Sequence, residues 1–174
     1  MKQIFTLLIV SMIFSCQSKE NIEKLNEMQT RMPEVPTNEN EIKGKEWLTK
    51  SIEGHFANDN PKMIMMTTPN YYEFKLDALN LELGLPESIS KEEFTKKWSE
   101  RFDLTKPDIY NAFLIPVQDF GKIKVNACEF IKNENDTLIY NVEMSDLQFN
   151  TNYKSTIKIV PAEKGFLVAD VYQL

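Results

Sequence analysis

The spacing of apolar residues changes near Pro107, and this change constrains the fold more than any other feature of the sequence. Beyond Pro107, apolar and polar residues alternate in four segments, as in β-strands that bury one face: "KIKVNA", "TLIYNVEM", "YKSTIKIV" and "FLVADVYQL". Because the connections between successive segments are short, an antiparallel meander is predicted. A turn is expected at Asn133–Asp136. A β-bulge is expected at Cys128, where the alternation slips.

Before Pro107 the apolar residues recur at helical spacing. Leu48, Ile52 and Phe56 share one face of a helix predicted from Glu41, and a short apolar helical turn follows at 61–68. A third helix is predicted after Thr68-Pro69, ending at Gly84. Its apolar stripe is Tyr72, Leu76, Leu79 and Leu83.

The last predicted helix is Lys91–Phe102, which begins with a capping box formed by Ser90 and Glu93. Phe94, Trp98 and Phe102 lie on one of its faces, and we expect Trp98 to point into the concave face of the sheet. Helices followed by a meander predict an α+β fold, with the N-terminal helices packed on a curved antiparallel sheet.

The N-terminus carries the signals of a secreted and anchored protein. Lys2 precedes an apolar run, Ile4–Phe14, which is shorter than the ~20 residues that span a bilayer and is typical of a signal peptide. The run ends at Ser15-Cys16, which resembles a bacterial lipobox. The resemblance implies cleavage before Cys16 and lipid on that residue; an uncleaved anchor or cleavage elsewhere are the alternatives.

These signals predict three parts: a lipoprotein signal peptide (1–15), a tether (16–40) and a single domain (41–174). The predicted location is the bacterial cell envelope, anchored by lipid to the outer membrane, on its periplasmic face or at the surface. A net charge of -6 without a lysine or arginine cluster argues against nucleic acid as a partner.

Cysteine and histidine are scarce. If Cys16 is acylated, Cys128 has no partner for a disulfide, and its strand context predicts a buried, inert thiol. His55 is the only histidine, which excludes a site built from several histidines, and no calcium-loop spacing of carboxylates is seen. No metal and no cofactor are expected.

Several motifs resemble a known family. "HFANDNPKMIMMTT" and "FLVADVYQL" resemble the opening and closing of the nuclear-transport-factor-like cone fold of SnoaL-like proteins and ketosteroid isomerases. "TTPNYYEFKLDALNL", "EEFTKKWSERFDL" and "VQDFGKI" are similar to a lipoprotein-rich branch of unknown function. The resemblance covers about Ile42 to Leu174 and implies a cone-shaped, cystatin-like domain. The chain lacks a clear strand hairpin between its second and last helices, where many members have one.

Enzymes of this family place an acid or base inside the cone, but no catalytic motif maps onto this sequence. The polar side chains considered for chemistry are His55, Asp77, Asp119, Glu129, Glu143 and Asp170. For the pocket we select His55, Asp119, Asp170 and Tyr172 as polar candidates and Tyr72 and Trp98 as aromatic ones. The alternatives are a structural His55, a turn-forming Asp119, a solvent-exposed Asp170 and core aromatics. Thr137, in an Asp-Thr-Leu sequence, is a candidate for O-glycosylation.

Two functional classes remain open. The first is a non-catalytic domain that binds a small apolar ligand or an envelope protein. The second is a small isomerase or dehydratase acting on an apolar ligand in the cone. The single histidine and the missing catalytic motif favour the first. A pocket containing a buried, desolvated acid would favour the enzyme, and a filled cone would favour the binding domain.

Overall fold

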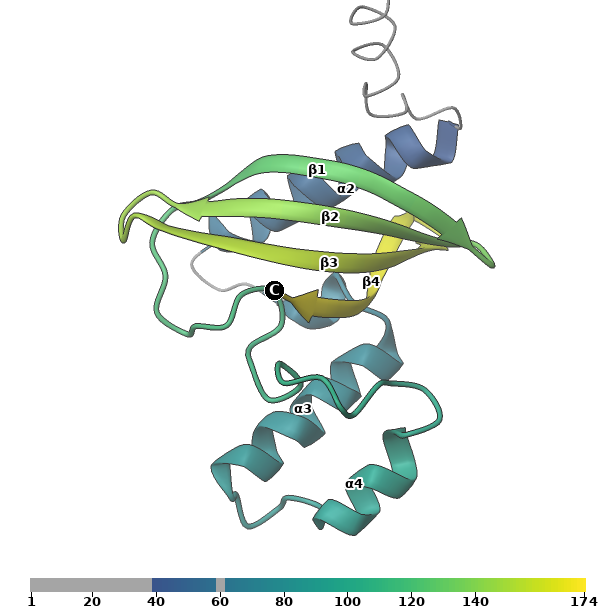
Figure 1. Ribbon diagram of the computed structural model, residues 1–174, viewed down its shortest axis with the longest axis vertical. Coiled ribbons are helices and arrows are strands. Elements are labelled where there is room, and N and C mark those ends of the chain that lie inside the picture. Colours follow the sequence, from purple (N-terminus) through teal and green to yellow (C-terminus); the bar gives the residue numbers. More distant parts are fainter. Residues whose placement is uncertain (1–38, 59–61) are drawn as a thin grey trace, which may run out of the picture. The chain divides into compact units, whose positions relative to one another are not determined.

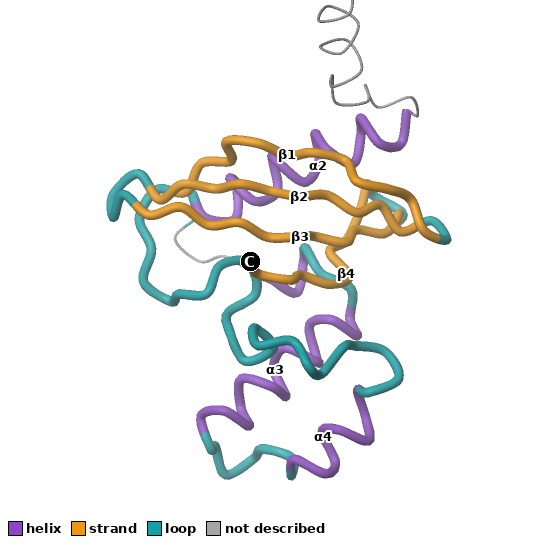
Figure 2. Tube along the Cα trace, viewed as in Figure 1, coloured by secondary structure: helices purple, strands orange, loops and turns teal. Residues whose placement is uncertain are grey.

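The structure is a computed structural model that describes residues 39–58 and 62–174. Its helices are α2 (Glu39–Phe56), the 3-10 helix η1 (Met63–Met65), α3 (Pro69–Leu83) and α4 (Lys91–Trp98). The strands are β1 (Ile123–Glu134), β2 (Thr137–Asp146), β3 (Thr151–Ala162) and β4 (Gly165–Gln173). They form one antiparallel sheet in the order β1-β2-β3-β4, so the predicted α+β class and meander are confirmed (Figures 1 and 2). The predicted signal peptide, Cys16 and residues 17–38 of the tether lie outside the described residues.

The sheet differs from the prediction in the position of its irregularities. The register between β1 and β2 shifts between Val125 and Ala127, ahead of Cys128, and shifts again between Phe130 and Lys132. The expected bulge at Cys128 is therefore wrong: Cys128 pairs regularly with Val142 and is buried. The turn between the strands is confirmed, with positive φ at Asn135 and Asp136, as a tight hairpin requires.

Helix α2 packs on the inner face of the sheet (Figure 1). Leu48 and Ile52, at helical spacing, are fully buried in the same core as Tyr140 of β2. Glycine at position 44 allows a close approach, since a Cβ atom there would overlap the Tyr140 hydroxyl. That hydroxyl donates a 2.8 Å hydrogen bond to the carbonyl oxygen of Glu41, which fixes the first turns of α2 on the sheet.

Helix α3 has the predicted ends but buries a different face. Thr68 caps its N-terminus, and Gly84 ends it in the left-handed conformation with φ 61°. The predicted stripe is wrong: Leu76 and Leu83 are exposed, whereas Tyr71, Phe74, Lys75 and Ala78 are buried. The reason is that α3 packs on α4 and β4, and the loop that follows α4 covers its other flank.

Helix α4 begins with the predicted capping box between Ser90 and Glu93 and ends at Trp98, four residues earlier than expected. Trp98 is buried but does not point into the sheet. Its ring packs against Phe74 of α3 and Phe102, and its Nε1 donates to Asp77 of α3 at 2.9 Å. The expected partner of Trp98 is thus wrong, because α4 lies beside α3 (Figure 1).

Candidate functional site

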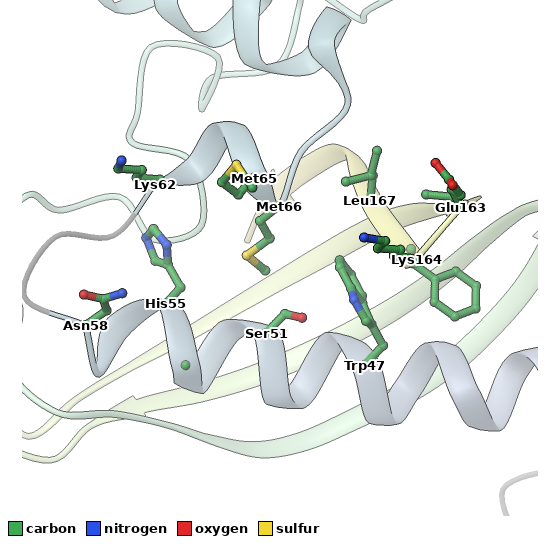
Figure 3. Close-up of a pocket in the computed structure, with 13 residues that line it drawn as sticks. Trp47, Ser51, His55, Asn58, Lys62, Met65, Met66, Glu163, Lys164 and Leu167 are labelled. Atoms are coloured by element: carbon green, nitrogen blue, oxygen red, sulfur yellow. The ribbon is translucent and has the colours of Figure 1, made fainter.

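A large groove runs between the C-terminal half of α2, η1 and the β3–β4 hairpin, and we call it the hairpin groove (Figure 3). Its volume is about 910 Å³, which is the size of a small-molecule site. Trp47, Ser51 and His55 reach it from α2, and Met65 and Met66 from the opposite wall. The other lining residues are Gly54, Asn58, Lys62, Ala162, Glu163, Lys164, Phe166 and Leu167.

One end of the groove is apolar. The rings of Trp47 and Phe166 lie 5.9 Å apart at 54°, and Met66 is buried beside the groove. Gly165 has a φ of 92° and lets the hairpin approach the Trp47 ring, since a Cβ there would lie 3.0 Å from Trp47 Cδ1. Met65 leaves 76% of its side chain exposed at the mouth of the groove. The flexible thioethers can adapt to ligands of different shape.

The polar groups in the groove are mainly cationic or neutral. His55 is half-buried, and burial lowers its pKa, so its imidazole is uncharged at neutral pH. It packs edge-on against Phe56, with 5.0 Å between the ring centroids. Lys62 and Lys164 are exposed, and no carboxylate of residues 39–58 and 62–174 lies within ion-pair distance of either. Glu163 is the one carboxylate among the described lining residues.

Of the predicted pocket residues, only His55 lines the hairpin groove. Asp170 instead forms 3.1 Å ion pairs with both Lys106 and Lys158, and Lys106 lies 5.3 Å from the centre of the Tyr172 ring. Tyr72 stacks on Phe113, and Trp98 belongs to the α3–α4 core. The hairpin groove is therefore lined by none of the other four, whose side chains contact residues of other elements instead: Asp170, Tyr172, Tyr72 and Trp98.

Asp119 is exposed and does not organise the turn near it. The buried Asp146, which no sequence pattern singled out, organises this region instead. Its carboxylate accepts hydrogen bonds from the backbone N–H groups of Gly121, Gln148 and Phe149. One carboxylate thus joins the start of β1 to the β2–β3 turn. The signal for this role, an Asp at the end of an alternating strand, is too common to identify it in advance.

The remaining candidates are also structural or exposed. Asp77 accepts from Lys97 and from Trp98, Glu129 is exposed, and Glu143 pairs with Lys154 across the sheet. Thr137 is partly exposed beside the β1–β2 turn. Cys128 is buried as expected, and burial raises the pKa of its thiol to about 11, which keeps the thiol protonated and unreactive.

A buried charged cluster lies near β4, and no sequence pattern predicted it. Lys75 is 3% exposed, and its ammonium donates to the carbonyl oxygens of Ile109 at 2.8 Å and Asp108 at 3.3 Å. The Asp108 carboxylate is also buried; one of its oxygens accepts from the Gln173 N–H at 2.7 Å. The void beside these groups measures about 10 Å³, enough for at most one water molecule. The cluster leaves no room for a ligand.

Lys75 makes stability depend on pH. Burial lowers the pKa of its ammonium to about 8, with Asp108 and Asp170 opposing the shift. Below pH 8 lysine is protonated in both states; between pH 8 and its unfolded pKa of about 10.4 only the unfolded state binds the proton. The free energy of unfolding should therefore rise with pH in this window, by at most about 1.4 kcal/mol per unit.

Urea unfolding at pH 7.5, 8.3 and 9 tests this expectation, with Lys75→Met as the matched variant. From about pH 8 upward the Cys128 thiol acts in the opposite direction, because burial raises its pKa, but this contribution is present in both proteins and cancels in the difference between the parent protein and Lys75→Met. The variant should lack the rise that the parent protein shows. Equal pH dependence in both proteins would contradict a folded-state pKa near 8 for Lys75.

Other kinds of site were sought in the described part of the chain. Residues 39–58 and 62–174 hold no cluster of three or more histidine, cysteine, aspartate or glutamate side chains arranged to bind a metal ion. None of the helices in these ranges is both long and apolar enough to cross a membrane.

Comparison with protein-family models, with curated proteins and with solved structures gave no match. Function must therefore be inferred from the hairpin groove itself.

Proposed function

We propose that the chain is a cell-envelope lipoprotein whose folded domain binds a small, partly apolar ligand in the hairpin groove without catalysing a reaction. The observation that carries this proposal is a groove of about 910 Å³ with an apolar end and, at its edge, two lysines that pair with no carboxylate of the described residues. We also propose that the domain is related to the SnoaL-like cone fold. Helices followed by a four-stranded antiparallel meander support that relationship.

The distribution of buried acids favours binding over catalysis. A general acid or base must lie within hydrogen-bond reach of the reacting atoms. The buried Asp108 lies beside a void of only about 10 Å³, and the one described carboxylate that lines the groove, Glu163, is exposed. The inner face of the sheet is filled by fully buried side chains such as Leu48, Ile52 and Tyr140. A filled inner face is what we expect of a non-catalytic binding domain.

One observation supports the alternative of a small isomerase or dehydratase. His55 lines the groove, and its lowered pKa leaves an uncharged imidazole that can accept a proton at neutral pH. No carboxylate of the described residues is hydrogen-bonded to this imidazole, so none of them orients it as a base. The enzyme is therefore the second candidate.

The outer face of the sheet is less suited to a protein partner than the groove is to a ligand. Its polar side chains already pair across the strands: Thr156 donates to Asn141 at 2.9 Å, and Ser145 donates to Asn152 at 2.7 Å. Lys154 pairs with Glu143 in the same way. A docking protein would have to replace these contacts, whereas a ligand in the groove would contact Lys62 and Lys164, which pair with no carboxylate of the described residues.

Gly54 offers a direct test of binding. It lines the groove, and a Cβ atom there would meet nothing within 4 Å, so a larger side chain can occupy the groove without straining α2. Native mass spectrometry of the protein purified from its source should show a retained ligand. Gly54→Leu should lose that ligand while keeping its stability, and Gly54→Ala should retain it. A ligand retained equally by Gly54→Leu would show that the groove is not the binding site.

The anchor is tested separately at Cys16. Expressed in a Gram-negative host, the protein is expected to partition into detergent and to incorporate labelled palmitate, because lipid on Cys16 supplies the membrane affinity. Cys16→Ser should abolish both. Labelling that survives the substitution would contradict the proposed lipoprotein.

A further inference from the structure

We propose that the ligand of the hairpin groove is an amphipathic anion, with an apolar body and a carboxylate or similar group. This inference rests on the proposed function and adds the chemical class of the ligand. It is carried by two features that occur together in the groove: apolar aromatic and thioether walls, and two lysines without an acidic partner among the described residues.

The charge of the groove is opposite to that of the chain. The protein has a net charge of -6, and some lysines elsewhere pair with acids: Lys97 contacts Glu73 and Asp77, and Lys106 contacts Asp170, whereas others, such as Lys96, pair with no carboxylate of the described residues. Lys62 and Lys164 line the groove from opposite sides, and no carboxylate in the described ranges lies within 4 Å of either. Among the described lining residues, two lysines without a described acidic partner lie with one exposed glutamate, so these side chains carry a net positive charge in an acidic protein.

The apolar surface lies next to these cations. Trp47 and Phe166 form a tilted aromatic pair, and Lys164 and Leu167 line the same groove from the hairpin that carries Phe166 (Figure 3). Met65 and Met66 contribute the facing wall. A ligand whose apolar part covers Trp47 can therefore place an anionic group beside the Lys164 ammonium.

His55 agrees with an anionic ligand. Its imidazole makes no hydrogen bond with a side chain or backbone group of the described residues. The imidazole is uncharged at neutral pH, so one ring nitrogen carries a proton that it can donate to a ligand. A carboxylate accepts such a bond, but an ammonium could donate to the other ring nitrogen, so His55 is compatible with an anion and the lysines favour it over a cation. A cationic ligand would also meet Lys62 and Lys164 as like charges.

Three probes of the same carbon-chain length separate the apolar and the charged contributions to binding: hexanoate, 1-hexanol and hexylammonium. Each is titrated against the full chain in lipid nanodiscs, with empty nanodiscs subtracted, and binding is followed by the fluorescence of Trp47. Trp47→Phe identifies the signal, because the other tryptophan, Trp98, is buried in the α3–α4 core. A charge-assisted hydrogen bond should make hexanoate bind about tenfold more tightly than hexanol. Hexylammonium should bind most weakly.

The lysines supply the matched variants. Lys62→Gln/Lys164→Gln should lower the affinity for hexanoate to that for hexanol and leave hexanol unchanged. Lys96→Gln, an exposed lysine of α4, should change neither. Added salt should weaken hexanoate alone, because surface charges are screened.

The outcomes distinguish this inference from the proposed function. If hexanol binds as tightly as hexanoate, or if the two lysines do not matter for hexanoate, the anionic class is wrong, while the groove remains an apolar binding site. If none of the probes alters Trp47 fluorescence, the proposed binding function fails, and the ligand class fails with it.

Discussion

Gly44→Ala is expected to destabilise the protein strongly. The added methyl group would overlap the Tyr140 hydroxyl and lie 3.0 Å from Leu138 Cδ1, so α2 must move away from the sheet. Overpacking of this kind costs about 1–3 kcal/mol. Displacing the Tyr140 hydroxyl also breaks its bond to the Glu41 carbonyl, at about 1–3 kcal/mol for unpaired buried groups. The better helix propensity of alanine offsets about 1 kcal/mol of this loss.

Gly54→Ala in the same helix is the matched control. A Cβ there meets nothing within 4 Å, so only the propensity gain remains, and stability should rise by about 0.5–1 kcal/mol. Urea unfolding measures both variants. Two glycines replaced identically in one helix are thus expected to change stability in opposite directions.

A double mutant identifies the contact responsible. Tyr140→Phe removes the oxygen that the new methyl group would overlap, so Gly44→Ala should cost less in that background than in the parent protein. The coupling energy from this double-mutant cycle should be favourable. Equal costs in both backgrounds would mean that the Tyr140 hydroxyl does not limit the approach of α2 to the sheet.

The features that the sequence predicted correctly depend on neighbours along the chain. Strand alternation, the Ser90–Glu93 capping box and the end of α3 at Gly84 each involve residues within a few positions of one another. The buried face of α3 could not be predicted in the same way. Lys75 is buried because carbonyl groups more than 30 residues away accept hydrogen bonds from its ammonium, whereas the neighbouring Leu76 is exposed. Packing partners that are far away in sequence determine which of these two side chains is buried.

The candidate site depends on long-range partners even more. Trp47 and Phe166 are more than 100 residues apart in sequence and meet only because the β3–β4 hairpin folds back over α2. His55 was predicted because it is the only histidine and lies at the edge of an apolar helix face. Lys62 and Lys164 pair with no carboxylate of the described residues because of where those acidic side chains lie in space, and the sequence carries no signal for it.

Trp98→Ala is expected to be among the most damaging single changes in the protein. The ring is 1% exposed, lies 5.7 Å from both Phe74 and Phe102, and donates a hydrogen bond to Asp77. Removing a buried tryptophan costs about 3–5 kcal/mol. A domain of this size has about 5–15 kcal/mol of stability, so the variant should show a greatly lowered urea midpoint or fail to fold.

Trp47→Ala is the control, and the comparison tests the corrected packing of α4. Trp47 is half-buried with one side on the groove, so its removal leaves a smaller cavity and should lower the urea midpoint less. Trp98→Phe retains the aromatic packing against α3 but loses the bond to Asp77, and it should fall between the parent protein and Trp98→Ala. A neutral Trp98→Ala together with an unfolded Trp47→Ala would show that the α3–α4 core is not where Trp98 contributes.

Because Trp98 contacts α3 and not the sheet, its loss should first release α3 and α4. Hydrogen exchange should then accelerate in these helices more than in β2 and β3.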